Sequence, residues 1–148
     1  MTIRAVRAFD AAEWLRMRTV LWPSEDHASE IAEYLRSGGS PLLTIVFVAE
    51  RPAGGLAGFV ELGLRLYAEG CDSTPIPFIE GWYVEEDYRN LGIGRELIRA
   101  AEMWARAQGY REIASDVEIE NKGSIAAHRA LGYEEVTTLV CFRRDLQK

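Results

Sequence analysis

A predicted strand that leads through a glycine-bearing turn into a predicted helix constrains this chain more than any other feature. Residues 78–84, Phe-Ile-Glu-Gly-Trp-Tyr-Val, have the aromatic and β-branched character of a strand. The turn Arg89-Asn90-Leu91-Gly92-Ile93-Gly94 follows, and apolar residues then recur at helical spacing until Gly109 supplies a stop. The turn is therefore predicted to lie at the N-terminal end of a helix.

This turn is a candidate anion-binding site. Gly92 and Gly94 leave the backbone bare where the first N–H groups of a helix have no intrahelical partner. The helix dipole favours negative charge there, and Arg89 and Arg95 add cations at the same end. A phosphate group fits such a turn. The alternative is a tight turn that needs glycine for steric reasons alone.

Spacing excludes two familiar phosphate-binding motifs. The dinucleotide fingerprint requires a third glycine where Leu97 stands, and the Walker loop requires a Gly-Lys-Ser/Thr triplet that is missing here. What remains is the pattern Arg89-x-x-Gly92-x-Gly94 between a strand and a helix.

Two carboxylates are predicted to lie on strands. Strict alternation places Phe78, Glu80, Trp82 and Val84 on one face of the sheet and Ile79, Gly81 and Tyr83 on the other. A second carboxylate, Asp116, lies in a predicted strand at 112–117. Burying a carboxylate is costly unless it is paired or used. Such a pair can deprotonate an ammonium directly or through water, or it can be a structural pair in which one carboxyl is protonated.

The order of predicted elements indicates an α/β fold with a single sheet of mixed direction flanked by helices. The order is β-α-α-β-β-β-α-β-α-β, with a parallel crossover through the helix after Gly94. The strands are predicted at 3–6, 42–50, 56–66, 78–84, 112–117 and 134–144, and the helices at 11–21, from the caps at 24–26 to Gly38, from the glycine turn to Gly109, and at 121–131. Asp10 is a predicted cap of the first helix. We expect residues 1–148 to form one domain.

The composition of the chain limits the classes of molecule that it can be expected to bind. The net charge of -6 argues against nucleic acid, which requires a basic surface, and a cationic partner fits better. The longest apolar run, Leu42 to Ala49, is too short to span a membrane, and the N-terminus lacks the apolar region of a signal peptide. Cys71 and Cys141 have neither metal nor redox spacing, so we expect no metal and free thiols in a cytoplasmic protein.

The turn and the element order resemble the GNAT acetyltransferase superfamily over essentially the whole chain. Five further short matches are similar to the aminoglycoside 6'-N-acetyltransferases of the small dimeric type. They are Leu21-Trp22-Pro23, Tyr67 followed by Gly70-Cys71-Asp72-Ser73, Phe78-x-Glu80-Gly81, Ala114-Ser115-Asp116, and Asn121.

This resemblance implies a GNAT fold, transfer of an acetyl group from acetyl-CoA to a primary amine of an aminoglycoside, and hence antibiotic resistance. It places Glu80 and Asp116 beside that amine as catalytic residues, and Trp22 and Tyr67 around the sugar rings. It also implies a homodimer completed by the C-terminal strand. The residues implied to bind the coenzyme are Trp82, Tyr83, Val84, Arg89, Asn90, Leu91, Gly92, Ile93, Gly94 and Asn121.

Two positions depart from the family pattern. His128 stands where many members have a tyrosine that protonates the departing thiolate, and Thr137 stands where close relatives tend to be acidic. Histidine can serve as the acid, or it can be a structural residue. Two other functions stay open because a fold does not fix a substrate: a GNAT enzyme for another cation, such as a polyamine or a peptide amine, and a non-catalytic acetyl-CoA-binding module.

Overall fold

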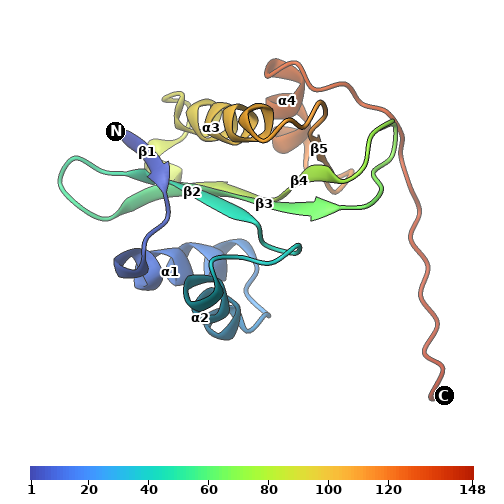
Figure 1. Cartoon of the computed structure of the whole chain (residues 1–148), viewed down its shortest axis with the longest axis horizontal. Coiled ribbons are helices and arrows are strands. Elements are labelled where there is room, and N and C mark those ends of the chain that lie inside the picture. The colour runs from blue at the N-terminus through green and yellow to red at the C-terminus, as the bar shows by residue number, and fades with distance from the viewer. The chain divides into compact units, whose positions relative to one another are not determined.

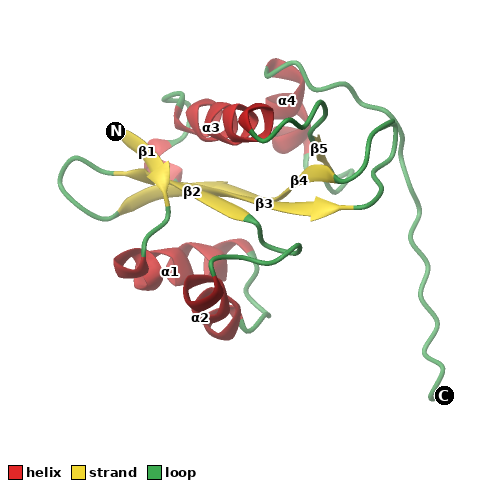
Figure 2. Ribbon diagram, viewed as in Figure 1, coloured by secondary structure: helices red, strands yellow, loops and turns green.

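The computed structural model describes residues 1–148 in two units, 1–115 and 116–148. Figures 1 and 2 show their strands and helices. The first unit contains β1 (Thr2–Ala5), η1 (Ala8–Asp10), α1 (Ala11–Leu21), α2 (His27–Ser37), β2 (Ile45–Glu50), β3 (Leu56–Arg65), β4 (Ile76–Val84), η2 (Glu86–Tyr88), α3 (Ile93–Ala107) and β5 (Ala114–Ser115). The second unit contains α4 (Lys122–Ala130).

One mixed sheet, with strands in the order β1-β2-β3-β4-β5, forms the centre of the first unit. Its first four strands are antiparallel neighbours, whereas β5 runs parallel to β4. A parallel pair needs a crossover, and α3 provides it. This confirms the predicted α/β class, the mixed sheet and the crossover after the glycine turn.

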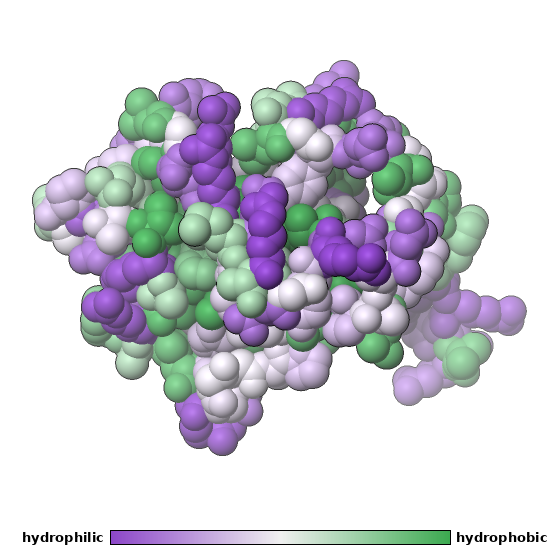
Figure 3. Space-filling view, turned by 45° about the horizontal axis from the view of Figure 1, so that its top comes forward, coloured by the Kyte–Doolittle hydropathy of each residue, from purple (hydrophilic) through white to green (hydrophobic).

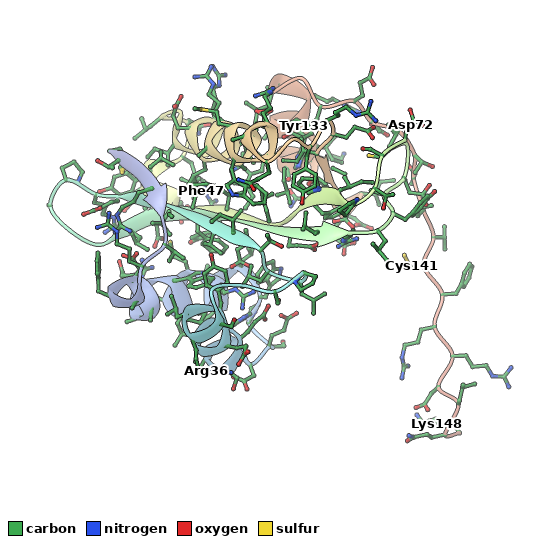
Figure 4. All side chains as sticks on the ribbon, viewed as in Figure 1. Arg36, Phe47, Asp72, Tyr133, Cys141 and Lys148 are labelled. Carbon is green, nitrogen blue, oxygen red and sulfur yellow. The ribbon has the colours of Figure 1, made fainter.

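Helices cover both faces of this sheet. Figure 1 shows α1 and α2 on one face and α3 on the other. Val46 and Val48 on β2 belong to a buried cluster with Trp14 and Met17 of α1. Because side chains alternate along a strand, Phe47 lies on the face that carries α3 (Figure 4). The hydrophobic core of the unit is therefore divided into two layers by the sheet.

A β-bulge interrupts β4 at Glu80. Leu62 pairs with Ile79 and Glu61 pairs with Gly81, so Glu80 has no partner of its own on β3. After the bulge the alternation of faces is reversed, since Tyr83 joins the cluster under α1 while the Trp82 ring lies against Gly94 of α3. The strict alternation predicted for 78–84 is thus wrong beyond Glu80.

Three local predictions also differ from the structure. The carboxylate of Asp10 does not cap α1, because it accepts hydrogen bonds from the Arg4 guanidinium at 2.7 and 2.9 Å and from the Arg7 N–H at 2.8 Å. The strand predicted at 112–117 is reduced to Ala114–Ser115. Residues 134–144 form no strand.

The second unit consists of α4 and an extended C-terminal segment, which Figure 2 draws as a loop and on which Figure 4 labels Cys141 and Lys148. Its apolar side chains are exposed, at 61% for Leu139, 78% for Val140 and 93% for Phe142. Hydrophilic and hydrophobic residues are interspersed over the face shown in Figure 3. None of the helices has the length and apolar character needed to cross a bilayer.

Candidate active site

The N-terminal end of α3 is open to a ligand. Gly92 precedes the helix in the left-handed conformation, with φ of 85°, and Asn90 in the same turn also has a positive φ of 63°. No side chain caps this helix end, whereas Asp26 caps α2. The first N–H groups of α3 therefore have no intrahelical or side-chain acceptor, which is the arrangement that binds phosphate.

The two glycines of the turn have different roles. A Cβ atom at Gly92 would meet nothing within 4 Å, so glycine is favoured there by the positive φ alone. A Cβ atom at Gly94 would lie 3.2 Å from the Trp82 ring, so glycine favours the close approach of α3 to β4 there. Arg89 closes the turn, because its Nε donates to the Val84 carbonyl at 2.8 Å.

The two neighbours of β4 in the sheet pair with it over very different lengths. On one side β3 accompanies β4 as far as Val84, but on the other side β5 pairs only with Phe78 and Ile79. The pairing with β5 therefore ends at Ile79, whereas β4 itself continues to Val84. The Tyr83 side chain is 8% exposed in the core, so only its backbone can meet a ligand.

Glu80 follows the end of this pairing, and its partner is Arg65. The Arg65 guanidinium donates to both carboxylate oxygens, from Nε at 2.9 Å and from Nη2 at 2.7 Å. The same guanidinium lies 3.5 Å from the centroid of the Phe78 ring. The side chains of Arg65 and Glu80 are 43% and 26% exposed. Glu80 is thus a solvent-accessible carboxylate held by a bidentate cation, not a fully buried one.

Trp22 lies against Gly81, the residue after Glu80, but Tyr67 is held elsewhere. A Cβ atom at Gly81 would lie only 2.5 Å from Cη2 of Trp22, so the indole rests directly on the bulge. The hydroxyl of Tyr67, on the loop after β3, donates to Glu69 at 3.2 Å, and the charge of Glu69 raises the pKa of Tyr67. The structure therefore brings Trp22 to the bulge, whereas the polar contact of Tyr67 is within its own loop.

The remaining predicted residues belong to the second unit. Asp116 is exposed and follows β5 directly. Asn121 caps α4, since its side chain accepts from the Ser124 N–H at 3.1 Å. Nδ1 of His128 is 2.7 Å from the Ser124 carbonyl, so this nitrogen carries a proton. The exposed Thr137 lies in the C-terminal segment.

Sequence reasoning missed Arg65, His27 and Arg18, all of which contact predicted site residues. Arg65 is the last residue of β3, and a cation at the end of the strand that precedes β4 was the signal that could have identified it as a partner of Glu80. His27 and Arg18 carry no comparable signal, because their contacts depend on how α1 and α2 pack. No group of three or more His, Cys, Asp or Glu side chains is placed to hold a metal ion.

Comparison with known proteins agrees with this geometry. Residues 8–133 match the family model described as acetyltransferase (GNAT) family. This chain belongs to that family. The match confirms the resemblance to this superfamily found in the sequence.

Individual relatives of this GNAT protein match almost end to end. It is 46% identical over 147 residues to an aminoglycoside N(6')-acetyltransferase type 1 of Klebsiella aerogenes, covering 97% of this chain and 96% of the relative. It is 40% identical to the protein of the same name from Stenotrophomonas maltophilia, covering 99% and 94%. Among solved structures, AAC(6')-Iy in complex with the bisubstrate analog CoA-S-monomethyl-acetylneamine has a TM-score of 0.88 at 33% identity, covering 97% of each chain.

Proposed function

We propose that this GNAT protein is an aminoglycoside 6'-N-acetyltransferase, which moves the acetyl group of acetyl-CoA to a primary amine of an aminoglycoside and thereby confers antibiotic resistance. One observation carries the proposal. An accessible carboxylate, Glu80, stands in a bulge where the pairing of β4 with β5 has ended, and the indole of Trp22 rests on Gly81, the next residue. A carboxylate and a flat aromatic face together suit a sugar that bears an ammonium group.

The residues around α3 fit acetyl-CoA as cosubstrate, whose thioester supplies the acetyl group. The amides from Leu91 to Gly94 suit its pyrophosphate, because no side chain occupies the end of α3. We assign the backbone of Trp82, Tyr83 and Val84 to its extended arm, because the pairing of β4 with β5 ends at Ile79 and these residues follow it toward α3. We assign Arg89, Asn90, Ile93 and Asn121 to the same ligand.

The proposed chemistry requires a carboxylate to hold and deprotonate the amine. An aminoglycoside amine is largely protonated at neutral pH and cannot attack a thioester until the proton leaves. Both oxygens of Glu80 already accept from Arg65, so we assign proton removal to Glu80 through a bridging water. Asp116 is its proposed partner. Ile79 of β4 pairs with Ser115 of β5. Glu80 is the residue after Ile79 in the chain, and Asp116 is the residue after Ser115. Trp22 and Tyr67 complete the proposed substrate site.

The experiment follows release of the CoA thiol on mixing the protein with acetyl-CoA and a panel of amines. We expect release with aminoglycosides and none with polyamines or peptide amines. We also expect Glu80→Gln and Asp116→Asn each to lower kcat/KM by about 10²-fold, the usual effect of losing a positioned acid or base. Glu33→Gln, at an exposed carboxylate on α2, is the matched control. Near-normal rates with an unchanged ascending limb of the pH profile would show that both carboxylates are structural.

We further propose that the two units form one cytoplasmic GNAT domain and that two copies form a homodimer through the C-terminal segment. Val136, Leu139, Val140 and Phe142 are all at least half exposed in one copy, and covering them would remove apolar surface from water. Light scattering at micromolar concentration tests this proposal. A monomer would contradict it.

A further inference from the structure

A buried cluster of charged and polar side chains lies between β3 and the helices α1 and α2. Arg18, His27 and Glu61 are 3%, 2% and 1% exposed. The Glu61 carboxylate accepts from Nε and Nη2 of Arg18 at 2.7 and 3.0 Å, and from Nε1 of Trp14 at 2.8 Å. A buried ion pair of this kind is often no more stabilising than apolar residues of similar volume. Stability alone therefore does not account for the cluster.

His27 links this cluster to Trp22. Nη1 of Arg18 lies 3.2 Å from Nδ1 of His27 and 3.1 Å from Glu30. Because a guanidinium has only donors, Nδ1 must be the acceptor, and the proton of a neutral ring must be on Nε2. Nε2 lies 2.6 Å from the carbonyl oxygen of Trp22 and donates to it. The neighbours of His27 thus fix both its tautomer and its orientation.

Trp22 is held from several directions at once. Its N–H donates to the Arg18 carbonyl at 2.8 Å, and its carbonyl accepts from His27. The Arg18 guanidinium carbon lies 5.3 Å from the centroid of its ring, and the His27 ring lies 6.0 Å away. Gly81 supports the ring from the sheet, at a position where no Cβ atom fits. The buried cluster therefore sets the position of an indole that lies on Gly81, the residue after Glu80.

We infer that His27, together with Arg18 and Gly81, is a positioning residue of the substrate site. The bond from Nε2 of His27 to the Trp22 carbonyl holds the Trp22 indole on the bulge, where it presents an aromatic face to the sugar ring of an aminoglycoside. The inference rests on the proposed function, because it assigns Trp22 to that substrate.

Two substitutions separate the two hydrogen bonds of His27. His27→Gln places an amide N–H near the position of Nε2 and keeps the bond to the Trp22 carbonyl. His27→Asn places an amide oxygen near the position of Nδ1, so it keeps the bond from Arg18 and leaves the Trp22 carbonyl without its donor. Both variants lose the imidazole ring, so each is the control for the other. The melting temperature of each is measured to confirm folding.

The readouts are the KM values for both substrates and the indole N–H resonances of the four tryptophans in a nitrogen–proton correlation spectrum. Trp22→Phe identifies the Trp22 resonance. For His27→Asn we expect the aminoglycoside KM to rise by about five- to tenfold, as for one lost buried hydrogen bond, with the acetyl-CoA KM unchanged and the Trp22 resonance shifted. For His27→Gln we expect values near those of the wild type.

Equal effects of the two variants on KM, or an unmoved Trp22 resonance in His27→Asn, would overturn the inference. The spectrum also separates this inference from the proposed function. If wild-type protein acetylates no aminoglycoside, the proposed function fails. A Trp22 resonance that moves in His27→Asn and stays in His27→Gln would still show that His27 positions Trp22.

Discussion

Removing the positive charge of Arg65 should tighten the binding of a cationic substrate. Its guanidinium now occupies both oxygens of Glu80, at 2.9 and 2.7 Å, where the substrate ammonium is proposed to bind. The ammonium must displace this guanidinium or share the carboxylate with it. In either case, the positive charge of Arg65 opposes a substrate that is itself a polycation.

The size of the effect follows from exposure. The side chains of Arg65 and Glu80 are 43% and 26% exposed, so solvent screens their attraction. Such a pair contributes about 0.2–1 kcal/mol, which limits the competition to a factor of about five in affinity. We therefore expect Arg65→Met to lower the aminoglycoside KM by about two- to fivefold. Methionine keeps an unbranched apolar stem against Phe78, so the packing there is largely preserved.

The assay is steady-state release of the CoA thiol at low and at high salt. The KM for acetyl-CoA should not change, and the gain in Arg65→Met should shrink as salt rises, because salt screens accessible charges. Arg65→Lys keeps the charge and is the matched control, with an expected KM near that of the wild type. A raised aminoglycoside KM, or a kcat at least about tenfold lower in Arg65→Met, would refute the reasoning and show that Arg65 orients Glu80 for catalysis.

Two other predictions concern the turn before α3 and the N-terminal end of the chain. Gly92→Val and Gly94→Val should abolish acetyl-CoA binding in calorimetric titrations of folded protein. The first variant strains a backbone position with a positive φ, and the second crowds the Trp82 ring on β4. Wild-type affinity in both variants would contradict this prediction. Burial by itself raises the pKa of Asp10, but hydrogen bonds from Arg4 and the Arg7 N–H outweigh it and lower that pKa below its usual value. The resulting stability is present above about pH 4 and is lost as the pH falls through the lower, folded-state pKa. In urea unfolding, the free energy of unfolding of Asp10→Asn should therefore be about 1–3 kcal/mol lower than that of the wild type at pH 7, and the difference should be smaller at about pH 3. A difference that does not depend on pH would count against this assignment.

Features set by short stretches of sequence were predicted well. The helix between the cap at Asp26 and the stop at Gly38 is observed as α2, because Asp26 accepts the Ser29 N–H and Gly38 adopts the left-handed conformation with φ of 78°. The strand, turn and helix from 78 onward are confirmed for the same reason. Each depends on residues close together in the chain, which a pattern of propensities can identify.

Features set by contacts between distant residues were not predicted. The pairing of Arg65 with Glu80 requires β3 and β4 in one particular register, and the bond from His27 to Trp22 requires the corner between α1 and α2. The strand predicted at 134–144 is a different case. Its alternating apolar residues favour a strand, but a strand also needs a partner, and one copy of the chain provides none.

The bulge and the short β5 together determine where the site can be. Pairing between β4 and β5 ends at Ile79, and the bulge removes the next residue from pairing with β3. Glu80 is therefore the first residue of β4 after the pairing with β5 and the one residue of β4 within its pairing to β3 that has no partner there. The end of the pairing with β5 and an accessible carboxylate thus fall at the same position. The sequence could identify Glu80 as an unusual residue for a strand. It could not show that the bulge and the end of the pairing with β5 coincide there, because strict alternation of faces does not reveal a bulge.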